Sequence, residues 1–320
     1  MIKLKVGNPP HVRTEDTVRA VMIDVLIGLI PATIAATVFF GWYALFLIVL
    51  GAVAGELIEL WIMKGIRKKK DFVWDGSAAV TGALLAMNVG VGTPWWVMLI
   101  GLFFALAVAK HAFGGIGQNI FNPALAGRVF LLISFPTYMT GKVFFLPDSV
   151  TQATPLTIFS DAGHSIDAVW NAGISYWDLF LGKIGGTLGE TSTLALLIGF
   201  LYLVARKRIK LMIPITYVGT TFLFALVGWL INPQLGDPLF HILSGGLMLG
   251  ALFMATDMVT SPMTPKGQAI FGFGAGALTY IIRLFGAYPE GVSFSILIMN
   301  GLVPLIDMYT QPRIFGEVKE

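Results

Sequence analysis

The sequence contains no cysteine. This absence excludes disulfide bonds, cysteine nucleophiles, thiolate-bound zinc and iron–sulfur clusters held by cysteines of this chain. Charge is also scarce, because only 12% of the 320 residues are charged, against about 25% in an average soluble domain. These few charges cannot cover the surface of soluble domains totalling this length. The composition therefore excludes a soluble, disordered or fibrous protein.

Apolar residues and glycine are abundant instead. Hydrophobic residues make up 56% of the chain, there are 37 glycines, and the mean hydropathy is +0.80. Small residues allow membrane helices to approach closely. The apolar residues form long runs, whereas the strands of a transmembrane β-barrel alternate over about ten residues. We therefore predict an all-α polytopic membrane protein.

Apolar runs of about 20 residues mark helices that can cross a bilayer. The sequence contains ten such runs, and the third, fifth and sixth are short enough to be tilted, broken or re-entrant. The runs cover residues 21–40, 42–63, 76–90, 95–114, 122–138, 191–205, 211–231, 238–258, 268–287 and 292–310.

Lysine and arginine are unevenly distributed among the connections. Seventeen of the 21 lie in the termini and in every second connection, most densely at 64–70 and 206–210. Basic connections stay on the cytoplasmic side of a membrane. We therefore predict that segment 1–20 and the tail 311–320 are cytoplasmic and that the long connection 139–190 lies outside.

The connection 139–190 is mildly acidic and shows turn signals but no helical pattern of its own. A connection of this length is often functional. Its start carries a hydroxyl-rich segment at 148–157. Composition alone reveals no modification there.

Two segments indicate an internal repeat. GALLAM at 82–87 resembles GALFMA at 250–255, and each precedes a break that leads to a hydroxyl residue and proline. An odd number of helices in each repeat requires the second repeat to be inverted, as in many transporters. We predict two inverted five-helix repeats, 21–138 and 191–310, and chance similarity between glycine-rich and leucine-rich helices is the alternative.

Five carboxylates lie in or at the edges of the predicted spans, toward the cytoplasmic half. Such groups are costly at membrane depth and are functional candidates by default. Glu56 and Glu59 are three residues apart and share a helix face. Either they bind a cation or relay protons, or they pair with the basic cluster 67–70. Our candidate ion path comprises Glu56, Glu59, Asp24 and Asp307.

A glycine-rich break, KHAFGGIGQNIFNPA, covers residues 110–124. Glycine permits unusual backbone angles and close approach of a ligand. Asn122-Pro123 fits an N-cap followed by a first-turn proline, and a helix N-terminus attracts anions or polar groups. The break lacks the GK[ST] ending of a phosphate-binding loop.

Two arginines fall inside predicted spans. Arg128 needs an anionic or carbonyl partner, which is either a ligand or an acidic side chain embedded in a helix. Arg283 lies nearer the outer edge, where we expect it to snorkel. The hydroxyl-rich and proline-rich segment that starts at Asp257 and ends at Pro265 either stops the eighth span or lines a polar cavity.

Three motifs together resemble one known family. They are KHAFGGIGQNIFNPALAGR at 110–128, DMVTSPMTPKGQ at 257–268 and TQATPL at 151–156. Their order and spacing resemble the D subunit of the Rnf electron-transport complex, which is related to the B subunit of the sodium-pumping NADH:quinone reductase. The resemblance covers essentially the whole chain. TQATPL lies where that family carries its flavinylation motif.

The resemblance implies a covalent FMN, joined through its phosphate to Thr154. Thr151 and Thr157 are the alternative acceptors. Gln152 stands where glycine is common in the family and Ile120 replaces a frequent proline. Neither departure removes the acceptor.

The resemblance also implies that the FMN headgroup docks against the broken helices. We expect its contacts among Lys110, Asn119, Asn122 and Arg128. A second, noncovalent flavin (riboflavin or FMN) is expected at the break that contains Asp257, Thr260 and Ser261.

The function implied by the resemblance is a membrane flavoprotein subunit of a ferredoxin:NAD oxidoreductase complex. It relays electrons and couples them to Na⁺ or H⁺ translocation across the bacterial inner membrane. The implied partners are the flavin-bearing G subunit and the iron–sulfur membrane subunits. We expect no catalytic residue acting alone, no metal site and no nucleic-acid partner. The residues alone favour a secondary transporter or channel, which has no use for a covalent flavin.

Overall fold

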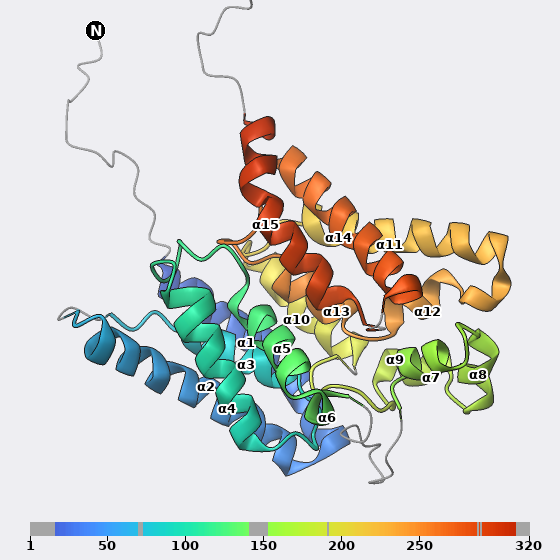
Figure 1. The fold of residues 1–320 in the computed structure, drawn as a ribbon, viewed down its shortest axis with the longest axis horizontal. Coiled ribbons are helices and arrows are strands. Elements are labelled where there is room, and N and C mark those ends of the chain that lie inside the picture. Colours follow the sequence, from blue (N-terminus) through green and yellow to red (C-terminus); the bar gives the residue numbers. More distant parts are fainter. Residues whose placement is uncertain are drawn as a thin grey trace, which may run out of the picture.

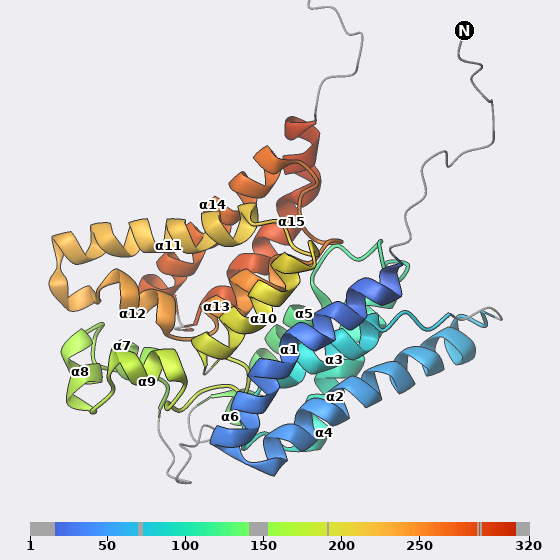
Figure 2. The same ribbon diagram turned by 180° about the vertical axis from the view of Figure 1, so that it is seen from behind.

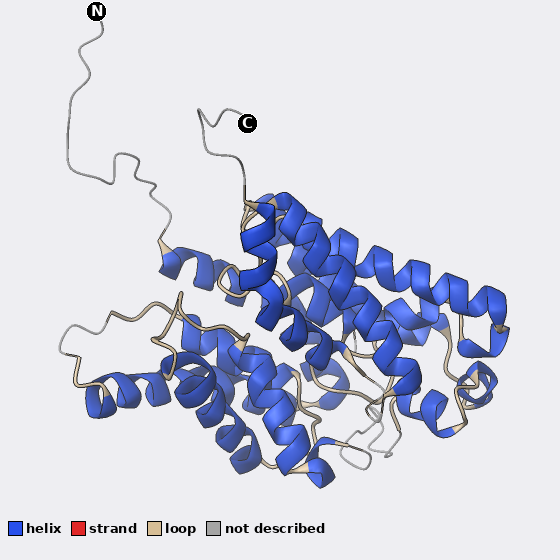
Figure 3. Cartoon of the chain, turned by 45° about the horizontal axis from the view of Figure 1, so that its top comes forward, coloured by secondary structure: helices blue, strands red, loops and turns tan. Residues whose placement is uncertain are grey.

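The computed structural model describes residues 17–69, 73–140, 153–190, 192–286, 288 and 290–311. Within these ranges every regular element is a helix, as Figure 3 shows. Many of these helices have high apolar content and exposed apolar faces, as expected of helices that contact lipid. The predicted all-α membrane fold is confirmed.

The first half of the chain forms one group of helices, drawn in blue to green in Figure 1. Two of these helices continue into short π-helical turns. The elements are α1 (Val18–Phe40), α2 (Trp42–Trp61), η1 (Ile62–Ile66), α3 (Ser77–Met87), α4 (Trp95–Phe104), η2 (Ala105–His111), α5 (Pro123–Ser134) and α6 (Pro136–Met139).

The second half forms the neighbouring group, drawn in yellow to red. Its third span is broken into short pieces. The elements are α10 (Thr193–Ala205), α11 (Met212–Ile231), η3 (Pro233–Leu235), α12 (Pro238–Leu243), α13 (Leu247–Leu249), η4 (Gly250–Met254), α14 (Pro265–Phe285) and α15 (Val292–Thr310).

Each of the ten predicted runs coincides with an apolar helical segment. Among the described residues, five are long enough to cross a membrane: α1, α2 with η1, α11, α14 and α15. A sixth span results if Pro233–Leu243 and Leu247–Met254, which are bent by 46°, count as one. The other four are shorter apolar helices. Ten full crossings and the inverted repeat therefore stay predictions.

The connection 139–190 is helical in part, so the expectation of no helical structure there was wrong. Within its described part it forms α7 (Pro155–Asp161), α8 (Ile166–Asn171) and α9 (Tyr176–Leu181), which lie beside α12 in Figure 1. Helices of six or seven residues are too short to show a clear apolar period. They pack through a small cluster that includes Phe159, Leu179 and Phe240.

Basic residues from three connections lie around the glycine-rich break, and we call the region of Arg67, Lys110 and Arg208 the basic end. The Arg67 guanidinium donates to the Gly114 carbonyl at 2.6 Å. Arg208, from the connection after α10, donates to Asp24 of α1 at 2.6 Å. This arrangement agrees with the predicted sorting of charges, while the cytoplasmic assignment stays a prediction.

The two halves meet directly where α1 packs against α10, side by side in Figure 2. A Cβ added to Gly199 would overlap the carbonyl oxygen of Gly28. Conversely, a Cβ added to Gly28 on α1 would lie 3.0 Å from the Leu203 side chain on α10. The absence of side chains at both glycines therefore allows this close contact.

Candidate functional site

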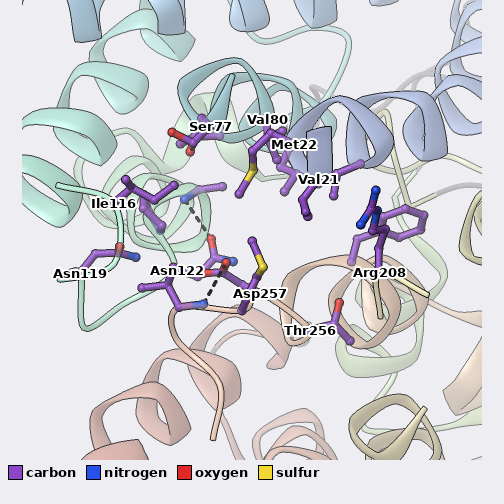
Figure 4. A pocket seen from close by; sticks show the side chains of 18 of the residues that line it. Val21, Met22, Ser77, Val80, Ile116, Asn119, Asn122, Arg208, Thr256 and Asp257 are labelled. Atoms are coloured by element: carbon purple, nitrogen blue, oxygen red, sulfur yellow. Dashed lines mark hydrogen bonds between the residues drawn. The ribbon is translucent and has the colours of Figure 1, made fainter. Parts of the chain in front are cut away.

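A cavity of about 90 Å³ lies between the two halves near the basic end, and we call it the first cavity. Figure 4 shows Asn122 and Asp257 converging at its centre, with Ser77 on one wall and Arg208 on the far side. It shares four wall residues with a neighbouring cavity of about 400 Å³: Arg208, Ile209, Thr256 and Met258. The two cavities are therefore neighbours along a common wall.

The glycine-rich break forms one wall of the first cavity. Gly114, Gly115 and Gly117 have φ values of 132°, 105° and 87°, which favour glycine because other residues rarely adopt them. These turns bring Asn119 into the wall before α5 starts at Pro123.

Asn122 caps α5, as predicted. Its Oδ1 accepts from the backbone N–H groups of Ala124 at 3.0 Å and Leu125 at 3.3 Å. Its amide nitrogen donates to the Met254 carbonyl at 3.0 Å, and its backbone N–H donates to Asn300 at 3.1 Å. One side chain therefore stabilises both the start of α5 and the end of η4.

The break after η4 forms the opposite wall. Asp257 accepts from the Thr260 hydroxyl at 3.0 Å and lines the first cavity. Thr260 is buried behind it, whereas Ser261 lines the neighbouring cavity. The segment therefore both follows the end of the eighth span and contributes Asp257 and Ser261 to the cavity walls.

Lys110 connects the first cavity to α2. Its Nζ lies 2.7 Å from Glu59 Oε1 and donates to the Ser77 hydroxyl at 2.6 Å. His111 Nε2 lies 2.8 Å from the same Glu59 oxygen. Glu59 therefore pairs with Lys110 and His111, neither of which belongs to the basic cluster 67–70.

The candidate ion-path carboxylates do not form one cluster. Glu56 accepts from the Ala79 N–H at 2.8 Å. Asp24 lies on α1, where the Tyr202 hydroxyl donates to it at 2.9 Å in addition to Arg208. Asp307 lies on α15 and accepts from the Met263 N–H at 3.1 Å. Glu56 and Glu59 therefore share helix α2, whereas Asp24 and Asp307 lie on other helices and bond to other residues.

A second cavity, of about 350 Å³, lies between α5, α6, α7 and the start of α15. The buried Arg128 guanidinium forms part of its wall. Arg128 pairs with Glu290 and lies 3.9 Å from Glu190. Of the two alternatives for Arg128, the structure shows acidic partners, and these come from connections between helices.

Thr154 lies one helical turn from the second cavity. Its hydroxyl caps α7 by accepting from the Thr157 N–H at 3.2 Å, and it lies 2.9 Å from the Thr157 hydroxyl. Thr157 lines the cavity, while the Thr154 residue is 4% exposed. Thr151 and Gln152 lie outside the described residues.

Arg283 does not snorkel, so that expectation was wrong. It is buried, and its guanidinium donates to the carbonyls of His241, Ser244 and Glu290. The cause is the broken third span of the second half, because carbonyls at the end of α12 lack helical partners. Arg283 supplies donors to them inside the protein.

Sequence reasoning missed five polar residues around the cavities, of which four are buried and Glu290 is partly exposed. They lie in or beside apolar runs, which was an available signal. They are Asn88, Glu190, Glu290, Ser293 and Asn300.

Long apolar helices, broken helices and polar cavities at the breaks define a polytopic membrane protein with sites inside its helix bundle. The family model described as the NQR2, RnfD, RnfE family matches residues 5–316. The chain belongs to this family.

Curated relatives match over nearly the full length. The D subunit of the proton-translocating ferredoxin:NAD(+) oxidoreductase complex of Clostridium ljungdahlii is 46% identical, covering 97% of this chain and 96% of the relative. Its Na(+)-translocating counterpart from Acetobacterium woodii is also 46% identical, covering 99% and 97%. The D subunit of the ion-translocating oxidoreductase complex of Salmonella typhi is 37% identical, covering 98% and 99%.

Proposed function

We propose that this protein is the membrane flavoprotein subunit of an ion-translocating ferredoxin:NAD oxidoreductase complex. The names of relatives that match nearly the whole chain support the complex and its activity. Its partners in this proposal are the flavin-bearing G subunit and the iron–sulfur membrane subunits. The termini face the cytoplasm of a bacterial cell.

The single observation that carries the flavin assignment is the position of Thr154. Its hydroxyl caps α7 one turn from a cavity of about 350 Å³. We assign the covalent FMN to this hydroxyl. Esterification removes the hydroxyl hydrogen but leaves Oγ1 able to accept, so the Thr157 hydroxyl then becomes the donor of that pair.

The lining of the second cavity fits a flavin. Arg128 supplies a cation, and Tyr288 and Phe294 form a stacked pair with ring centroids 5.5 Å apart. The flavin itself supplies the electron-transfer chemistry, and the protein supplies orientation and electrostatics. In this proposal Arg128 orients the cofactor while Glu290 limits the net charge.

The noncovalent flavin is assigned to the first cavity. Its wall holds hydrogen-bond donors and acceptors from Lys110, Asn119, Asn122 and Asp257. The cavity of about 90 Å³ is smaller than a flavin ring, so binding requires the adjoining cavity of about 400 Å³, which Ser261 lines. In this proposal Thr260 acts through its bond to Asp257.

Glu56 and Glu59 provide the proposed ion path near the basic end. Glu59 is linked through Lys110 to the first cavity, so the charge of a ligand there acts on the carboxylate pair. Asp24 and Asp307 complete the proposed path. Na⁺ and H⁺ are both compatible with carboxylates, and the relatives include one protein named for each ion.

The flavin assignment is tested by mapping the adduct. The complex is coexpressed with a flavin transferase, denatured and tested for in-gel flavin fluorescence, and the labelled peptide is identified by mass spectrometry. We expect FMN on Thr154, complete loss of the label in Thr154→Ala and retention in Thr157→Ala. A label that persists in Thr154→Ala overturns the site, and an unlabelled wild-type protein overturns the flavoprotein function.

The ion path is tested by comparing ion uptake with electron transfer in proteoliposomes. We expect Glu56→Gln or Asp257→Asn to lower Na⁺ or H⁺ uptake per electron at least several-fold, because a carboxylate that binds an ion or proton is lost. Ferredoxin:NAD activity is measured in the same vesicles. Unchanged uptake per electron in both variants removes Glu56 from the path and excludes a role of the cavity residue Asp257 in coupling.

A further inference from the structure

Hydrogen bonds of buried residues, linked through the residues Thr260, Asn122 and Met254, join the two cavities through the interior of the protein. The connection starts at Asp257 in the wall of the first cavity and ends at Arg128 in the wall of the second. Its central members are Asn88, Asn122 and Asn300, which we call the amide chain. All three are buried, with exposed fractions of 1%, 4% and 1%.

The part near the first cavity joins two helix breaks. The Thr260 hydroxyl donates to Asp257, and the Thr260 carbonyl accepts from the Asn300 side chain at 2.9 Å. The Asn300 oxygen accepts from the Asn122 N–H at 3.1 Å. Asn300 therefore holds two walls of the first cavity in a fixed relation without lining that cavity itself.

The part near the second cavity passes through Met254. Asn122 donates to the Met254 carbonyl at 3.0 Å, and the Asn88 amide nitrogen lies 3.5 Å from the Met254 sulfur. The same Asn88 side chain donates to the Leu84 carbonyl at 2.7 Å and accepts from Arg128 at 3.0 Å. The Arg128 guanidinium is therefore bound by Asn88 as well as by Glu290.

The members of the amide chain cannot move independently. Each asparagine side chain uses both its oxygen and its nitrogen in the bonds described above, and burial removes water as a substitute partner. A buried polar group that loses its partner carries the full desolvation cost. Hydrogen bonds in series also polarise one another in a low-dielectric interior.

We propose that Asn88 and Asn300 are positioning residues that couple ligand binding in the two cavities. The inference rests on the proposed function, with a covalent flavin beside the second cavity and a noncovalent flavin in the first. Occupation of one cavity changes the affinity of the other, and the effect is reciprocal because it is a difference of binding free energies.

The test measures riboflavin affinity of the first cavity with and without the covalent flavin. The intact complex, washed free of noncovalent flavin, is titrated with riboflavin while its fluorescence quenching is followed. Four proteins are compared: wild type, Thr154→Ala, Asn88→Leu and the double variant. We expect Thr154→Ala to change the riboflavin Kd by about five-fold or more, and we expect less than a two-fold change in the Asn88→Leu background.

Thr221→Val is the matched control. Thr221 is fully buried on α11, and its hydroxyl donates to the Tyr217 carbonyl, outside the amide chain. Loss of the Thr221 hydroxyl must leave the five-fold effect of Thr154→Ala on the riboflavin Kd intact. If Asn88→Leu fails to assemble, Asn300→Ser interrupts the same connection with a smaller polar residue and must abolish the effect.

The outcomes separate this inference from the proposed function. A wild-type complex with no flavin on Thr154, or with no riboflavin binding, refutes the proposed function and the coupling together. Two flavins whose binding is independent refute the coupling alone. Coupling that survives in both Asn88→Leu and Asn300→Ser also refutes the role of the amide chain.

Discussion

The two cavities obtain their polar groups in different ways. The first cavity is lined at two helix breaks, where Asn122 and Asp257 bond to neighbouring backbone N–H groups. The second is lined largely by α7 and the segments at the ends of α5 and α15, and its buried cation is balanced by Glu190 and Glu290. Caps bond within a few residues, whereas a buried ion pair depends on distant segments being in place. Arg128 in the second cavity and the Lys110 and Glu59 pair beside the first cavity are both of this second kind.

This difference has an energetic consequence. Losing one neutral hydrogen bond costs about 0.5–1.5 kcal/mol, whereas removing one partner of a buried ion pair costs about 3–5 kcal/mol because the remaining charge is uncompensated. Loss of Arg128 is therefore expected to cost more stability than loss of the Asn122 cap.

Arg128→Met is the strongest test of this comparison. It leaves Glu190 and Glu290 without their cation, so we expect a loss of about 3–5 kcal/mol in stability, seen as a lower thermal unfolding midpoint of the complex in detergent. Adding Glu290→Gln removes one of the two carboxylate charges and is expected to restore part of the midpoint. If the single variant unfolds at the wild-type temperature, the second cavity does not depend on its ion pair.

Asn122→Ala is expected to have a smaller effect. It removes the cap of α5 and the bond to the Met254 carbonyl, at a cost of about 1–2 kcal/mol. It is also expected to weaken riboflavin binding, because Asn122 lines the first cavity.

Thr264→Ala is the control for this second variant. Thr264 caps α14 by accepting from the Gly267 N–H at 3.0 Å. The Thr264→Ala substitution therefore removes a cap of similar cost without removing a side chain that lines the first cavity. Equal riboflavin affinity in the two variants, measured by fluorescence titration, would contradict the assignment of Asn122 to the binding wall.

The same contrast explains which parts of the site could be predicted from the sequence. Asn122-Pro123 was correctly predicted as a helix start because capping depends on residues a few positions away. The glycine-rich break was recognisable for the same reason. The acidic partners of Arg128 were missed, since Glu190 and Glu290 lie in segments that only the tertiary fold brings to α5.

The helices show a similar limit. Apolar length predicted the positions of the ten runs, including the three expected to be short, but not the short fourth helical segment or the break in the eighth. It did not predict α7, α8 and α9, because caps such as the Ser175 and Asp178 pair stabilise helices too short to show a period. Arg283 was misplaced because its carbonyl partners at the end of α12 follow from a break in another span.

The contact between Gly28 and Gly199 has a consequence for the first cavity. Val21 and Val25 on α1 and Leu203 on α10 line that cavity, and the glycine pair fixes how closely the two helices approach beside it. A larger residue at either position would push α1 and α10 apart, and with them Val21, Val25 and Leu203 in the wall of the first cavity. The shape of that wall therefore depends on two glycines that do not line it.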